Sequence, residues 1–138
     1  MRIALYLLLI LSLPPAYAAS IAVVVHKDNA IDSLTRKQVA DIYMGRGTEL
    51  RKHPDLLVLD YQGDPKLRER FYWALTGKSL AQINAYWARL SFSGQANAPH
   101  RLVDQAAVLQ SIKRNADTLG FVDAANINDD VEVVLNLE

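Results

Sequence analysis

The stretch Gly63-Asp64-Pro65 contains residues that could hold an anion. It follows an apolar run typical of a strand, and it opens a predicted helix that carries Lys66 and Arg68. A helix that begins after a strand directs free N–H groups and its positive dipole end toward phosphate-like ligands. However, Asp64 supplies its own carboxylate at the capping position, and Pro65 has no N–H to donate. A plain N-cap is therefore the favoured interpretation, and an anion site at Gly63, Asp64, Lys66 and Arg68 is the alternative.

A second candidate is the loop that begins at Ser93-Gly94-Gln95. It follows the aromatic stretch from Tyr86 to Phe92, whose rings have the spacing of a buried helix face. Arg89 lies within that stretch, and a guanidinium group can bind an oxyanion through two parallel hydrogen bonds. Two interpretations stay open for Arg89, Ser93, Gly94 and Gln95: a ligand or partner contact, and a simple helix end.

The sequence offers no catalytic or metal-binding constellation. Its three histidines, His26, His53 and His100, are far apart and have no partner at a metal-ligand spacing. No serine or threonine of the exported part lies in a nucleophile motif, and the acidic residues near the C-terminus lack a calcium loop. We therefore expect no enzyme activity, no catalytic residues, no metal and no cofactor.

The N-terminus has the pattern of a cleavable signal peptide. Arg2 precedes an apolar run from Ile3 to Leu13, and Ala16-Tyr17-Ala18 places small residues at the positions that signal peptidase reads. The run is well short of the roughly 20 residues that span a membrane, so we expect no stable span. This pattern predicts a signal peptide over 1–18, a single domain over 19–138 and a periplasmic location.

The composition narrows the class of protein further. The chain of 138 residues has fifteen basic and fifteen acidic residues, and loss of Arg2 with the signal leaves it slightly acidic. A near-neutral chain lacks the uncompensated positive charge that nucleic-acid binding requires. The absence of cysteine excludes disulfides and a lipid-anchored cysteine, so the exported chain must fold on its hydrophobic core alone.

Strand and helix patterns alternate along the chain. Short apolar runs predict strands, and capping boxes at Thr35 and Ser79 mark helix starts. The segment 46–53 is polar and is predicted to be a loop. Alternating strands and helices indicate an α/β protein with a partly parallel sheet. The expected strands are 21–25, 56–61, 101–103, 119–122 and 131–137, and the expected helices begin after Thr35, Asp64, Ser79 and Asp104.

Three stretches together resemble the phosphate-binding proteins of ABC transporters. The segment 34–46, LTRKQVADIYMGR, resembles a segment found in that family. The aromatic region 72–94 and the strand 119–122 each resemble a further segment of it. The resemblance implies a single lobe of the type 2 periplasmic-binding-protein fold, with a mixed, mostly parallel sheet flanked by helices. The chain also departs from the pattern of that family in two ways. Full-length relatives have a second lobe, and they have Ser-Gly-Thr where this chain has Gly63-Asp64-Pro65.

Two functions are compatible with this resemblance. In the first, the protein binds a small oxyanion such as phosphate, either weakly as one lobe or between the two copies of a homodimer. In the second, it binds no small ligand and is an accessory module that contacts an envelope transporter or a periplasmic sensor. An exposed apolar face would favour the second function.

Overall fold

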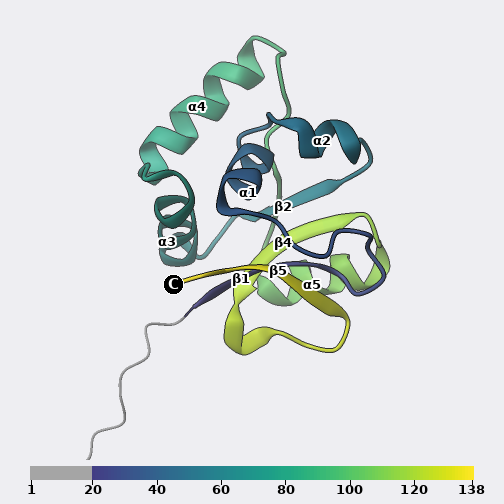
Figure 1. Cartoon of the computed structure of the whole chain (residues 1–138). Helices are drawn as coiled ribbons and strands as arrows, with labels where there is room; N and C mark the ends of the chain where they lie inside the picture. The colour runs from purple at the N-terminus through teal and green to yellow at the C-terminus, as the bar shows by residue number, and fades with distance from the viewer. Residues whose placement is uncertain (1–19) are drawn as a thin grey trace, which may run out of the picture.

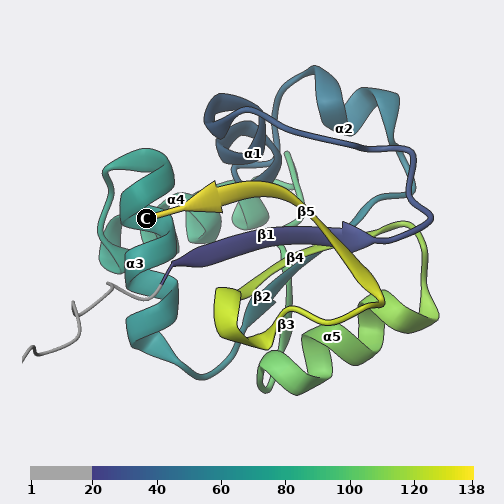
Figure 2. The same ribbon diagram turned by 60° about the horizontal axis from the view of Figure 1, so that its bottom comes forward.

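A computed structural model describes residues 20–138 of the chain, so the predicted signal peptide lies outside the described residues. Five strands form one sheet in the order β3-β2-β4-β1-β5. Helix α5 covers one face of this sheet, and α1, α2 and α3 cover the other, with α4 outside α3 (Figures 1 and 2). The predicted α/β class with a mixed sheet flanked by helices is confirmed.

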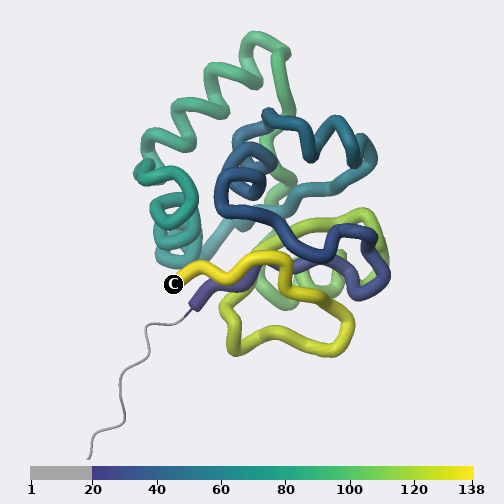
Figure 3. Tube along the Cα trace, in the orientation of Figure 1, coloured from purple at the N-terminus to yellow at the C-terminus, as the bar shows by residue number. Residues whose placement is uncertain are grey.

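The strands are β1 (Ile21–His26), β2 (Leu57–Tyr61), β3 (His100–Leu102), β4 (Thr118–Asp123) and β5 (Val131–Leu137). β2 is parallel to both of its neighbours, β3 and β4. β1 is antiparallel to β4 and to β5, so half of the pairings are parallel and the sheet is less parallel than expected. The first and last strands of the domain lie side by side, as the tube trace makes clear (Figure 3).

The helices are α1 (Arg36–Tyr43), α2 (Thr48–Lys52), α3 (Pro65–Thr76), α4 (Leu80–Phe92) and α5 (Gln105–Arg114). Both predicted capping boxes form, at Thr35 and at Ser79, and Asp104 caps α5 by accepting from Ala107 N. These caps satisfy N–H groups that a helix start leaves without partners. The predicted helix starts are therefore confirmed.

The predicted loop over 46–53 is wrong in part, because it contains α2. This short helix buries Glu49, whose Oε1 accepts hydrogen bonds from Gln38 Nε2 at 3.0 Å and from Lys52 Nζ at 3.3 Å. Gly47 has a φ of 92°, and a Cβ there would lie 2.8 Å from the Cβ of Asp41. Contact with α1 thus stabilises the helix α2, although the sequence of α2 is polar and has no pattern that predicts a helix.

An aromatic cluster fills the space between the sheet and the helices α1 and α3. Phe71 stacks on Phe121 with ring centroids 3.6 Å apart, and Tyr43 meets Phe71 edge-on at 4.7 Å. The buried hydroxyl of Tyr43 donates to Leu59 O at 2.8 Å, and that of Tyr61 donates to Phe121 O. Such pairs favour one arrangement of rings and satisfy the buried hydroxyls. The cluster therefore fixes α3 against the ends of β2 and β4.

Candidate functional site

The carboxyl ends of β2, β3 and β4 meet at one edge of the sheet, which we call the carboxyl edge. In open α/β sheets this edge is where ligands bind. Three acidic residues lie here: Asp64 and Asp104 follow β2 and β3, and Asp123 is the last residue of β4. Burial raises the pKa of Tyr61 far above its usual value, and Asp60, Asp64, Asp123 and Asp104 raise it further. The edge is therefore rich in negative charge.

The start of α3 is capped by the chain itself. Asp64 adopts a left-handed conformation, with a φ of 51°, and its side chain accepts from Leu67 N at 3.3 Å. Pro65 occupies the first turn, where it donates nothing. Gly63 and Lys66 are exposed beside this cap. The N-cap interpretation is confirmed, and the capping carboxylate occupies the place where an anion would meet the helix.

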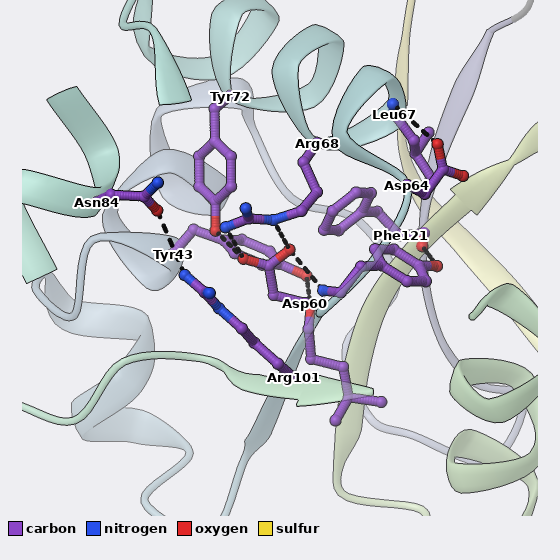
Figure 4. A network of polar contacts seen from close by, with 11 residues as sticks. Tyr43, Asp60, Asp64, Leu67, Arg68, Tyr72, Asn84, Arg101 and Phe121 are labelled. Carbon is purple, nitrogen blue, oxygen red and sulfur yellow. Dashed lines mark hydrogen bonds and ion pairs between the residues drawn. The ribbon is translucent and has the colours of Figure 1, made fainter. Parts of the chain in front are cut away.

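Arg68 is buried and already paired. Its Nε and Nη2 lie 3.0 Å from Oδ1 and Oδ2 of Asp60, which is the bidentate geometry of a strong ion pair (Figure 4). Tyr72 Oη donates to Asp60 Oδ2 at 2.7 Å. The exposed fractions of Asp60 and Arg68 are 2% and 6%. The guanidinium group that the alternative interpretation assigned to an anion therefore faces an internal carboxylate.

Tyr72 keeps its proton throughout the neutral range. Burial raises the pKa of its hydroxyl well above the usual value, and the charge of Asp60 and the hydrogen bond to it raise the pKa further. Arg68 and, more weakly, Arg101 oppose this shift of the pKa, because their positive charges favour the ionised phenol. The hydroxyl is thus a permanent donor to Asp60.

Arg101 is the exposed cation beside this buried pair. It stands directly opposite Asp60 in the parallel register of β2 and β3, and paired residues in a sheet share a face. Its Nη2 lies 3.3 Å from Asn84 Oδ1 on α4, and its side chain is open to solvent (Figure 4). Asp60, Arg68, Tyr72, Asn84 and Arg101 form what we call the Asp60 cluster.

The second group of predicted residues lies elsewhere, beyond the end of α4 distant from α3 (Figure 1). Gly94 N donates to Ser91 O and Gln95 N to Leu90 O, while Ser93 Oγ donates to Leu90 O. Gly94 has the left-handed conformation typical of a helix end. Arg89 lies over the ring of Tyr86. Ser93, Gly94 and Gln95 thus form a helix end, which the negative pole of the dipole makes unfavourable for anions.

The two predicted groups therefore do not come together, and the Asp60 cluster contains only Arg68 from either group. Sequence reasoning missed Asp60, Tyr72, Asn84 and Arg101. One signal was present: Asp60 is a carboxylate within an otherwise apolar strand, and a buried charge requires a partner. The sequence could not name that partner.

One hollow of about 370 Å³, lined in part by Asn29, His53 and Asp117, lies at the amino ends of β2 and β4.

Within residues 20–138, no group of three or more acidic, histidine or cysteine side chains could hold a metal ion. No helix in the same range is long and apolar enough to cross a membrane.

Two solved structures share this fold. One is a phosphate ABC transporter substrate-binding protein from Clostridium perfringens with bound phosphate, matched at a TM-score of 0.63 and 19% identity. The match covers 84% of this chain and 45% of that one. The other is an ABC-type phosphate transport receptor from Vibrio cholerae, with a TM-score of 0.53, 17% identity, and coverage of 84% and 46%. No family model and no curated protein sequence matches the chain.

The chain therefore shares its fold with part of each of these two phosphate-transport proteins, as the resemblance implied. The chain spans less than half the length of either solved structure.

Proposed function

We propose that this chain is an exported, non-catalytic solute-binding-like protein that binds a small oxyanion, such as phosphate, at the carboxyl edge. The observation that carries the proposal is the exposed guanidinium group of Arg101, next to the buried Asp60–Arg68 pair. Asp60 balances Arg68, so Arg101 contributes the uncompensated charge of this cluster. Lys66, exposed in the first turn of α3, adds a second cation to the same edge.

The affinity should be low. Small-molecule sites normally bury most of their ligand, and the carboxyl edge offers one open wall. The capping carboxylates of Asp64 and Asp104 also repel an anion at the two helix starts that face this edge. A second copy of the chain, placed across the edge, would supply the missing wall and raise the affinity.

Calorimetry with inorganic phosphate and sulfate tests this proposal. We expect heat of binding at millimolar anion for the wild type and none for Arg101→Ala. Arg89→Ala is the matched control, because Arg89 is also an exposed arginine but lies in the last turn of α4. Absence of heat in the wild type, or equal loss in both variants, would contradict a site at Arg101.

Replacement of Asp64 by asparagine should strengthen phosphate binding. Asparagine can accept the hydrogen bond from Leu67 N and tolerates the left-handed conformation, so the cap survives while its charge is lost. The interaction of two exposed charges is worth about 0.2–1 kcal/mol, so removing the repulsion corresponds to a gain in affinity of up to roughly fivefold. The measurement is the same titration, and an unchanged affinity would place the anion away from α3.

Export is tested by the mature N-terminus. Cleavage after Ala18 would leave Ala19 as the first residue of the protein recovered from the periplasm. Intact-mass measurement of that protein should give the mass of 19–138. Recovery of the uncleaved chain would contradict the signal peptide.

The accessory-module function is supported by a different observation. Trp73 on α3 is 64% exposed and lines a shallow hollow with Glu69 and Arg70, and tryptophan and arginine are enriched in protein-binding hot spots. The partner would be an envelope transporter or a periplasmic sensor. Capture of such a partner by the wild type but not by Trp73→Ala, together with no heat from any anion, would favour this function over solute binding.

A further inference from the structure

The carboxylate of Asp60 is coordinated as a bound oxyanion would be. Its Oδ1 accepts from Arg68 Nε at 3.0 Å and from the backbone N–H of Tyr61 at 2.7 Å. Its Oδ2 accepts from Arg68 Nη2 at 3.0 Å and from Tyr72 Oη at 2.7 Å. A guanidinium fork, a hydroxyl and a backbone N–H are donors that suit a carboxylate or a phosphate. The geometry is therefore that of an anion site with its ligand covalently attached.

The burial of these donors leaves no room for an external ligand beside Asp60. Tyr72 has no exposed surface, and Arg68 and Asp60 are almost as fully enclosed. The donors come from α3 and from the backbone at the end of β2, the position at which open α/β sheets hold their ligands. One side chain of the protein thus fills a place where a solute could otherwise be bound.

We infer that Asp60 is a built-in anionic ligand, and that Arg68, Tyr72 and the N–H of Tyr61 form a binding site for a small carboxylate. We call this the inner site, and in the wild type the carboxylate of Asp60 always occupies it. Because Asp60 already occupies Arg68, Arg101 alone of the two arginines is left for external anions. This inference concerns the inner site and does not depend on phosphate binding at Arg101.

Removal of the Asp60 side chain should expose the site to ligands of matching size. Asp60→Ala deletes the carboxylate group and leaves the space of a formate ion. Asp60→Gly also deletes the β-carbon and leaves the space of an acetate ion. Both variants keep Arg68 and Tyr72, which would then be buried without their acceptor and poised to bind an added anion.

The experiment measures urea unfolding of the full chain in sodium chloride, formate and acetate at equal ionic strength. For Asp60→Ala, the logarithm of the folding equilibrium constant should rise with the logarithm of formate concentration, with a slope approaching about 1. Asp60→Gly should respond more strongly to acetate than to formate. The wild type and Asp60→Asn, whose sites remain filled, provide the controls for general salt effects.

Each outcome decides the inference. A response specific to formate in Asp60→Ala, absent from chloride and from both controls, supports it. If Asp60→Ala is unfolded in chloride, recovery of the folded state in formate supports it equally. Equal behaviour in the three salts, or failure to fold in all of them, overturns it. Loss of the formate response in the double variant Asp60→Ala, Arg68→Met would confirm that the guanidinium group binds the anion.

Discussion

Phe71→Ala should lower the free energy of unfolding by about 3–5 kcal/mol, the usual cost of truncating a buried phenylalanine. Phe71 has no exposed surface and lies flat against Phe121 while meeting Tyr43 and Tyr72 edge-on. The cavity would lie between α3 and the sheet, where hydrogen bonds from the hydroxyls of Tyr43 and Tyr72 restrain these two neighbouring rings from moving into it. Urea unfolding followed by far-UV circular dichroism measures the change.

Phe92→Ala is the matched control for that substitution. Phe92 ends α4 and is 96% exposed, so its truncation leaves no cavity. We expect a change within about 0.5 kcal/mol, as for surface positions in general. A large loss of stability for Phe92→Ala, or a small one for Phe71→Ala, would mean that the aromatic cluster is not the centre of the core.

Arg68→Met should lower the free energy of unfolding by a similar amount, about 3–5 kcal/mol, because it leaves the carboxylate of Asp60 buried without its counter-charge. The methionine retains the apolar stem of the side chain, so the loss reports the charge and its hydrogen bonds more than packing. Tyr72 and the N–H of Tyr61 would remain as the named donors to Asp60. The measurement is again urea unfolding.

Two further variants separate the ion pair from other effects. Lys66→Met removes an exposed cation from the same helix and should change stability by less than about 0.5 kcal/mol. The double variant Asp60→Leu, Arg68→Met removes both charges and should recover much of the loss, since apolar replacement of a whole buried pair is often tolerated. If the double variant is no more stable than Arg68→Met, the unpaired charge of Asp60 is not the reason that Arg68→Met is less stable than the wild type.

The local sequence was sufficient to predict where most helices begin. Thr35 and Ser79 each precede a glutamine three residues later, and the reciprocal bonds of a capping box need only residues within one turn. Asp64 and Asp104 cap α3 and α5 in the same local way. Apolar runs likewise predicted β1 and β4, because a strand enclosed on both faces has no polar alternation. These features depend on neighbours in the chain.

The candidate site depended on contacts that no local pattern specifies. Arg68 was one of the candidate anion contacts, but it pairs with Asp60, eight residues earlier, because a buried carboxylate without a partner would be very unfavourable. Arg101 reaches the same cluster only because β3 pairs with β2 in one register, and a shift of one residue would turn its side chain to the other face. Capping and apolar patterning, which act within a few residues, were therefore readable from the sequence alone. Only the tertiary structure decided which charges meet, because strand register and helix packing bring together residues that lie far apart in the chain.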